Sequence, residues 1–401
     1  MLSFNSFDFF LNLFSLMIVL VPLYWALPWE TGRKLLLSVA GLYLLTTIAP
    51  RLALFYLGFW LLVWVLQNLV ERSAERREGL VVLWFSILVL LAFLLVWRFA
   101  ETWFIVNFNL DLNGALGAVS TSFYEMDLAS RIITPIGLSF ACFRAIDLLM
   151  KVNLGISERA PVLDVYYFGL FPSVQVIGPV AEFTEINVST RRWPDAEDLR
   201  SGFGQCLLGL FRIFVLAYPI RQSANLVSLW ETNSTTRLWL ELVLYGWFFY
   251  LNFAGFSDLA IGSSRLFGTK LKPNFRSPYK KTNPQDFWNS WHMSLTGFFQ
   301  RYVFLPLGGF RPERQFFALF ATIMAVALWH DISWQLVIFG TYHGVALIGH
   351  RILSEDRPPV DGKVLRVAKS LMLFFFFIPS IPLLSLEMGE VVGFYSHLIG
   401  L

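Results

Sequence analysis

The stretch that decides the fold is NPQDFWNSWHMSLTGFFQRYVFLPLGG, residues 283–309. Within it, large aromatic side chains are interleaved with polar ones such as Asp286, Asn289 and His292. A helix facing lipid would not tolerate so many polar groups, because each one is costly in hydrocarbon. A loop in water would not carry so many large aromatic rings. The stretch therefore predicts a helical segment lining a polar cavity inside a membrane protein.

The composition of the chain also indicates a membrane protein. Hydrophobic residues make up 56% and charged residues 15% of the 401 residues, whereas an average soluble protein has about 25% charged residues. The mean hydropathy is +0.59. A net charge of +3 is too small to indicate a nucleic-acid partner. Composition thus excludes an ordinary soluble domain and predicts a polytopic one.

Apolar runs long enough to cross a bilayer, about 20 residues each, recur along the chain. We expect about ten to twelve transmembrane or re-entrant helices, including runs at 9–28, 34–49, 52–70, 80–100, 202–220, 236–262, 315–330, 334–351 and 364–386. Residues 131–150 contain Arg144 and Asp147, whose spacing of three allows them to pair on one helix face. Residues 162–180 contain Pro172, Gly178 and Pro179, so we expect a broken element there.

The distribution of charge predicts the orientation of the chain in the membrane. The loops after the first and third spans carry more Lys and Arg than the others. The positive-inside rule therefore places these loops in the cytoplasm and the N-terminus outside. Residues 101–130 are expected to form a loop outside the membrane. The first apolar run lacks the basic start and the cleavage pattern of a signal peptide, so we expect it to remain as a helix.

All five histidines follow residue 291, and His292 and His330 each come directly after a Trp. Histidine is suited to act as a general base, because its ordinary pKa is close to neutral pH. The alternative interpretation is a hydrogen-bonded structural histidine in a helix bundle. No metal site is expected, because positions 292, 330 and 343 do not match a compact ligand motif.

The charged residues at 258–281 allow both a structural and a functional interpretation. A basic run contains no acidic residue and includes Lys270, Lys272, Arg276, Lys280 and Lys281. It either sets the orientation of the chain or forms a cytoplasmic docking surface for an anionic acyl donor, and the two roles are compatible. Asp258 either caps a helix or pairs with Arg265, or it supports a cavity.

At these residues the chain resembles the membrane-bound O-acyltransferase (MBOAT) family. The resemblance rests on an ordered series of motifs: YLNFAGFSDLAIGSSRLFG (250–268), NFRSPY (274–279), DFWNSWHMSLTGFFQRYVFLPLGG (286–309) and ALWHDISWQLVIFGTYHG (327–344). It is similar to the polysaccharide-modifying branch, which includes alginate O-acetyltransferase and teichoic-acid D-alanyl transfer proteins. Asp331 follows His330 where the family usually has glycine.

The resemblance implies an all-α membrane bundle around a central tunnel, with His330 and His292 as the catalytic residues. It implies one polytopic domain over residues 1–401, made of N-terminal spans (1–130), a catalytic core (131–351) and a C-terminal span and tail (352–401). We expect further motif residues to line the tunnel and bind substrate: Asn289, Trp291, Ser294, Trp329, Tyr342, His343 and Asp258.

The implied reaction moves an acyl group, acetyl as first choice, from a cytoplasmic thioester to hydroxyls of an extracytoplasmic polysaccharide or a partner protein. The donor is expected to be acyl-CoA or an acyl-carrier protein, and no bound cofactor is expected. The protein is expected in a bacterial inner membrane, with an extracytoplasmic acyltransferase as its partner. Alternatives are D-alanyl transfer to teichoic acid, acylation of a lipid or protein, or a transporter of an acyl or lipid-linked intermediate.

Overall fold

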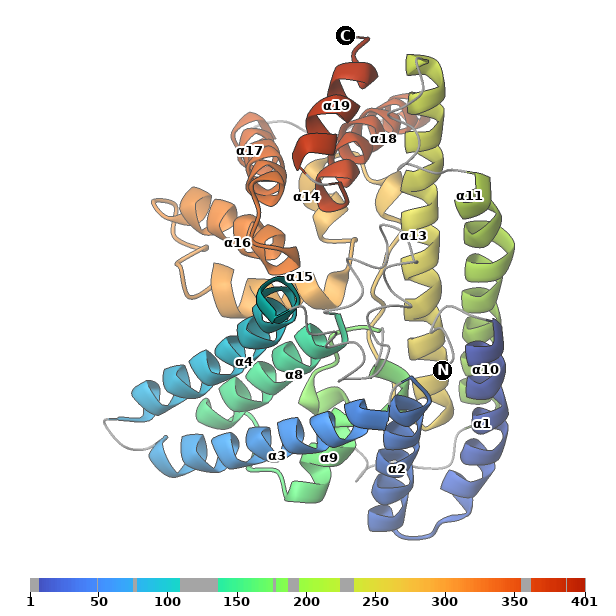
Figure 1. Ribbon diagram of the computed structural model, residues 1–401, viewed down its shortest axis with the longest axis vertical. Helices are drawn as coiled ribbons and strands as arrows, with labels where there is room; N and C mark the ends of the chain where they lie inside the picture. Colours follow the sequence, from blue (N-terminus) through green and yellow to red (C-terminus); the bar gives the residue numbers. More distant parts are fainter. Residues whose placement is uncertain are drawn as a thin grey trace. The chain divides into compact units, whose positions relative to one another are not determined.

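The computed structural model describes residues 7–48, 50–74, 78–108, 136–175, 178–186, 195–223, 234–354, 362–386 and 388–400. They form two compact units, Met1–Leu207 with Asp258–Leu271, and Leu208–Ser257 with Lys272–Leu401. Over these ranges the regular structure is helical, without a strand (Figure 1). The predicted all-α class is thus confirmed, whereas the predicted single domain with its three parts stays a prediction.

The first unit is built from the N-terminal helices and the end of a long helix that begins in the second unit. Its elements are α1 (Phe7–Ala26), α2 (Glu30–Ile48), α3 (Pro50–Ser73), α4 (Gly79–Phe108), α8 (Ile136–Asn153), α9 (Val162–Gly169), η1 (Pro172–Val174), η2 (Phe183–Glu185) and α10 (Ala196–Leu210). In Figure 1, α3, α4 and α8 lie side by side, and they pack against one another. Helix α4 extends through residue 108 into the segment predicted as a loop at 101–130, and the rest of that segment lies outside the described residues.

The element predicted to be broken at residues 162–180 is indeed interrupted. Helix α9 ends at Gly169, and Pro172 begins the short 3₁₀ turn η1. Helix α2 passes very close to this break, since a Cβ on Gly41 would lie 1.8 Å from the carbonyl oxygen of Leu170. Only a residue without a side chain permits this approach of the two backbones.

Two ion pairs that the local spacing allowed in this unit do not form. Arg144 does not pair with Asp147: its guanidinium lies 4.4 Å from the ring centroid of Phe168 and also over Trp60. Asp147 instead binds Lys151, one helical turn further on, with Oδ2 3.0 Å from Nζ. Spacing of three and four residues is equally close on a helix, so the neighbouring elements decided which pair formed.

The second of these pairs, one of the alternatives for Asp258, involves Arg265. This side chain contacts Asp198 at the start of α10, with Nε 3.3 Å from Oδ1, rather than Asp258. Lys270 shares the same carboxylate at 2.9 Å. Asp258 accepts a hydrogen bond from Gln205 at 3.3 Å. The carboxylate on the neighbouring helix is therefore the partner of Arg265, which local spacing along one helix did not reveal.

The second unit begins with the end of α10 and contains the motif series apart from residues 258–268. Its elements are η3 (Phe211–Ala217), α11 (Tyr218–Ser223), most of α13 (Thr235–Leu266), η4 (Pro278–Lys280), α14 (Pro284–Trp288), α15 (Met293–Phe299), η5 (Gln300–Phe304), α16 (Gln315–His330), α17 (Trp334–Ser354), α18 (Lys363–Phe377), η6 (Ile378–Leu384) and α19 (Met388–Leu398).

Helices α16 and α17 form a tightly packed hairpin (Figure 1). Gly340 and Gly344 make this possible, because a Cβ on either would come within 3 Å of a side chain of α16, Met324 or Phe320. The hairpin also packs on its neighbours in the same unit, α16 on α15 and α17 on α14. It thereby fixes the end of α16, where His330 lies.

Replacement of Asn283 with alanine is expected to lower stability by about 1 kcal/mol, the typical loss of an N-cap. The Asn283 side chain caps α14 by accepting a hydrogen bond from the backbone N–H of Asp286 at 2.8 Å. Thermal unfolding of the purified protein measures the effect. Asn283→Ser keeps a capping oxygen and should retain the wild-type melting temperature; equal losses in both variants would contradict a capping role.

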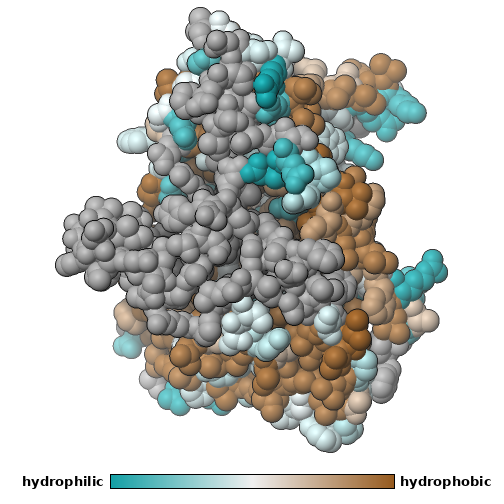
Figure 2. Space-filling model, turned by 45° about the vertical axis from the view of Figure 1, so that its right-hand side comes forward, coloured by the Kyte–Doolittle hydropathy of each residue, from teal (hydrophilic) through white to brown (hydrophobic). Residues whose placement is uncertain are grey.

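Five helices in the described part are long and apolar enough to cross a membrane: Leu52–Ser73, Gly79–Val96, Ala196–Gln222, Trp334–Leu353 and Lys363–Leu384. Two shorter apolar helices, Ser15–Ala26 and Gln315–His330, accompany them. Figure 2 shows broad areas of hydrophobic residues on the described surface, interrupted by small hydrophilic clusters. The prediction of a multi-pass membrane protein is confirmed, while its total of ten to twelve elements and its central tunnel stay predictions.

Candidate active site

His292 lies in the turn between α14 and α15, outside the five apolar spans, and its backbone is strained. Its dihedral angles, φ 43° and ψ 54°, place it in the left-handed region. Of the described residues other than glycine, only Ser277 shares a positive φ. Such a conformation costs about 1–3 kcal/mol and persists where surrounding contacts impose it, often at functional sites. The strain thus marks His292 as a position held for a purpose.

Asn274 supplies the contacts that hold this turn. Its backbone carbonyl accepts a hydrogen bond from the N–H of Met293 at 2.8 Å. Its side-chain oxygen lies 3.2 Å from Nδ1 of His292 and accepts from both the N–H and the hydroxyl of Ser294. Its amide nitrogen donates to Ser257 on α13 at 2.9 Å. Asn274 is 1% exposed, so these bonds form away from water.

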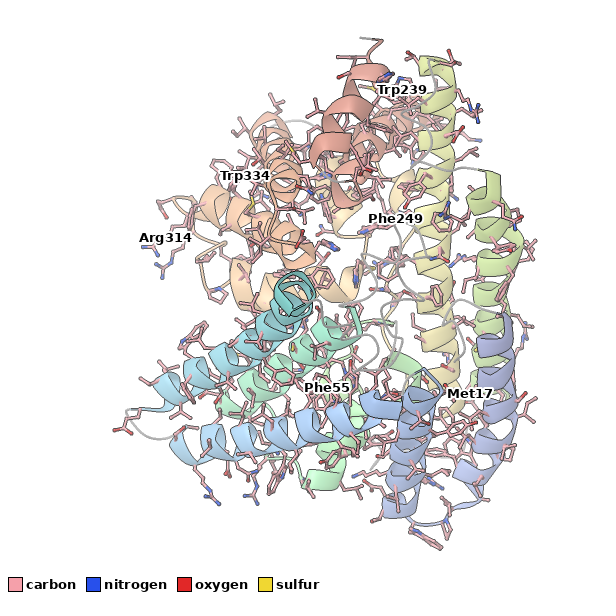
Figure 3. The ribbon with its side chains drawn as sticks, in the orientation of Figure 1. Met17, Phe55, Trp239, Phe249, Arg314 and Trp334 are labelled. Carbon is pink, nitrogen blue, oxygen red and sulfur yellow. The ribbon has the colours of Figure 1, made fainter. Side chains whose placement is uncertain are left out.

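Aromatic rings surround the polar turn. Trp291 is stacked between Phe249 of α13 and Phe287 of α14, with both pairs of rings 13° from parallel and their centroids 5.6 and 5.7 Å apart. Phe249 is labelled on α13 in Figure 3. Phe253 meets the His292 ring edge to face at 4.7 Å. These contacts exclude water and fix the orientation of the imidazole.

His330 is the last residue of α16 and is half-buried. Its ring lies against Trp329, with centroids 4.4 Å apart. The next residue, Asp331, is exposed and has an extended backbone that ends the helix. His330 lies close enough for its charge to act on His292. The structure therefore brings together, within one unit, the two histidines that the sequence predicted as catalytic.

Burial and, to a smaller extent, a charge on His330 together lower the pKa of His292 to about 3. The His292 side chain is buried with only 5% exposed, so desolvation of the imidazolium is the larger cause. At physiological pH, His292 is therefore a neutral ring. A neutral imidazole has one N–H donor and one nitrogen acceptor.

The lowered pKa predicts that stability falls with acidification. The unfolded chain binds a proton at His292 near pH 6.5, but the folded chain does not until about pH 3. The contribution of the neutral His292 to the free energy of unfolding is therefore complete above pH 6.5 and is lost as pH falls toward 3. At pH 5 the loss is about 2 kcal/mol. Between pH 7.5 and 5.0 the melting temperature should fall less for His292→Asn than for the wild type, because the variant lacks the titrating imidazole. Asn is chosen because it tolerates the left-handed backbone. Equal drops would contradict this.

The other predicted substrate-binding residues of this unit have varied surroundings. His343 is 1% exposed, enclosed by aromatic rings, with Nε2 2.9 Å from the Ser380 hydroxyl. Tyr342 stacks on Phe376 at 4.5 Å and donates a hydrogen bond to its carbonyl. Asn289 is exposed at the end of α14, and Ser294 and Trp329 are half-buried. Of these, Ser294 shares Asn274 with His292.

The remaining predicted residues are divided between the two units. Asp258 and Lys270 belong to the first unit, where Gln205 and Asp198 are their respective neighbours. In the second unit Lys272, Arg276 and Lys280 are exposed and Lys281 is half-buried. The charge of Lys270 is thus partly neutralised, whereas the other members of the basic run face the surface or lie near it.

Sequence reasoning missed Asn274 and Ser257. Both stand within quoted motifs, NFRSPY and the segment before Asp258. The available signal was a short polar side chain in each of the two motifs that precede the His292 stretch. Asn274 contacts Ser257, 17 residues before it, and His292, 18 residues after it. The periodicity of hydrophobic residues along the sequence does not reveal contacts between such distant positions.

Comparison with known proteins bears on the same residues. The model of the membrane-bound O-acyltransferase family matches residues 9–356. The chain is 29% identical over 266 residues to the probable alginate O-acetylase AlgI of Azotobacter vinelandii, covering 65% of this chain and 52% of that protein. It is 29% identical over 285 residues to the peptidoglycan O-acetyltransferase of Helicobacter pylori, with coverage of 63% and 52%.

A third relative is the teichoic acid D-alanyltransferase of Bacillus subtilis, 28% identical over 242 residues and covering 56% of this chain and 60% of that protein. The matched regions thus span about half the length of the curated relatives. The family match extends over most of the chain and includes both histidines of the site. The chain belongs to the membrane-bound O-acyltransferase family.

Proposed function

We propose that the protein is an O-acyltransferase that moves an acyl group, acetyl as first choice, from a thioester to a hydroxyl group. The main support is the pairing of two motif histidines in one unit. His292 is kept neutral by its burial and its Nδ1 lies against Asn274, while His330, half-buried at the end of α16, is close enough for its charge to act on His292. An acyl transfer needs a base that substrate can reach, and a dry environment that protects the thioester from hydrolysis.

In the proposed reaction His330 is the general base. The oxygen of the acceptor hydroxyl attacks the thioester carbonyl carbon, and His330 takes the hydroxyl proton. The C–O bond forms, the C–S bond breaks, and the leaving thiolate takes up the proton from the His330 imidazolium. The products are an ester and a free thiol, so atoms and charge balance without an additional reagent.

The proposed donor is an acyl-CoA or acyl-carrier protein in the cytoplasm, and the acceptor is an extracytoplasmic polysaccharide or partner protein. The exposed basic side chains of Lys272, Arg276 and Lys280 suit the phosphates of such a donor. The names of the relatives, O-acetylase and O-acetyltransferase, support acetyl and polysaccharide. We place the protein in a bacterial inner membrane with the N-terminus outside, working with an extracytoplasmic acyltransferase partner.

D-alanyl transfer to teichoic acid is the second candidate, since the relatives include D-alanyltransferases. A lipid or protein acceptor, or transport of an acyl intermediate without transfer, are further alternatives. A transporter leaves the thioester intact, whereas an acyltransferase consumes it.

Purified protein in proteoliposomes tests the proposal. Labelled acetyl-CoA is supplied on one side, an oligosaccharide on the other, and mass spectrometry follows both. The proposal expects equal amounts of free thiol and acetyl ester. Labelled thioester crossing the membrane unchanged would instead indicate transport. Transfer from D-alanyl carrier protein alone would indicate the second candidate.

A further inference from the structure

Three groups meet the side-chain oxygen of Asn274: Nδ1 of His292, and the N–H and hydroxyl of Ser294, which both donate to it. The Ser294 backbone N–H can only donate, so the atom it meets at 3.2 Å must be the amide oxygen. The amide nitrogen is accounted for by its bond to Ser257. The orientation of the Asn274 amide is therefore fixed by its neighbours.

This orientation decides where the proton of His292 lies. Because the amide oxygen only accepts, Nδ1 of His292 must carry the hydrogen that bridges the 3.2 Å between them. The ring is neutral, so Nε2 is then unprotonated. The left-handed backbone of His292 and the edge contact with Phe253 keep the ring in this place.

We infer that Asn274 is a positioning residue that fixes His292 with Nδ1 protonated, so that Nε2 accepts a hydrogen bond from a second hydroxyl of the acceptor substrate. The inference rests on the proposed function for the identity of the substrate. With no proton on Nε2, His292 cannot polarise the thioester carbonyl. Since His330 takes the proton of the attacking hydroxyl, the acceptor must offer another one, as a sugar ring with neighbouring hydroxyls does.

The tautomer can be measured without any acyl transfer. We would record ¹⁵N spectra of ¹⁵N-histidine-labelled protein in lipid nanodiscs, and assign His292 by the signal missing in His292→Asn. The inference expects a protonated, pyrrole-type Nδ1 and an unprotonated, pyridine-type Nε2, with this pattern lost in Asn274→Ala. A wild-type ring protonated on Nε2 would overturn the inference even if the protein transfers acyl groups.

Kinetics supply the second arm. Asn274→Ala should lower kcat/KM by about 10–100-fold, the range found when a partner that orients a histidine is removed, mainly through KM for the acceptor and not for the donor. An acceptor analogue lacking the neighbouring hydroxyl should be a poor substrate of the wild type and should lose little more in the variant. Equal penalties for both acceptors would overturn the role in acceptor binding.

Asn274→Asp has nearly the same shape but adds a carboxylate beside Nδ1. This charge should raise the pKa of His292, with which His330 is also coupled. The acid limb of the pH–rate profile should therefore move to higher pH. Asn68→Asp makes the same change in α3, where the Asn68 side-chain oxygen meets Arg159 at 3.1 Å, and should leave the profile unchanged. An unchanged profile in Asn274→Asp would overturn the inference, and a wild type without transfer would defeat the proposed function alone.

Discussion

Replacement of His330 with alanine is expected to lower the rate of acyl transfer by about 10²–10⁴-fold, the usual contribution of a positioned general base. The variant keeps the residues that precede it in α16 and loses only a half-buried ring. Folding should therefore be retained, and the amount of protein in the membrane and its melting temperature should match the wild type. The rate is measured as acetyl ester formed in proteoliposomes.

A second histidine gives the matched control. His397 lies in α19, where its Nδ1 faces the carbonyl of Gly393 at 2.9 Å, and no role is assigned to it. His397→Ala should retain wild-type transfer. If His330→Ala also retained full activity while folded, His330 would have no part in the reaction.

Replacement of Trp291 with alanine is expected to destabilise the protein by about 3–5 kcal/mol, the usual range for a buried Trp. Trp291 is 6% exposed and is stacked between Phe249 and Phe287, so its removal leaves a cavity that rigid neighbouring rings cannot fill. Because Trp291 precedes His292, transfer should fall as well. Thermal unfolding and the transfer rate of the same preparation measure both effects.

Trp334 provides a control of the same residue type. It stands at the beginning of α17 with 75% of its surface exposed, and it is labelled in Figure 3. Trp334→Ala should change stability by no more than about 0.5 kcal/mol. A loss for Trp334→Ala as large as that for Trp291→Ala would show that exposure does not separate the two positions.

Hydropathy and motif order were sufficient to predict the class of fold and the family, whereas the catalytic roles of the two histidines stay a prediction. Apolar runs report membrane helices because their length must match the bilayer. The mixture of aromatic and polar residues around His292 predicted a helical segment lining a cavity; the structure has two short helices there, α14 and α15, joined by a turn, and the cavity stays a prediction. These predictions depend only on which residues occur near one another along the chain, and the sequence gives that information directly.

Contacts across the fold were not predictable in the same way. Lys151 replaced Arg144 as the partner of Asp147, and Asp198 replaced Asp258 as the partner of Arg265. Local spacing allowed both Arg144 and Lys151 as partners of Asp147, and it could not report Asp198, which lies on a different helix from Arg265. Asn274 was missed for the same reason, since its contact with His292 depends on how two turns meet.

The central claim is that His292 and His330 act in one site. A double-mutant cycle on kcat/KM, using His292→Asn, His330→Ala and the combined variant, tests it most directly. The two histidines are close enough to interact, so the double variant should be little slower than His330→Ala. A double variant whose loss equals the product of the two single losses would show that the residues act independently, and would contradict the claim.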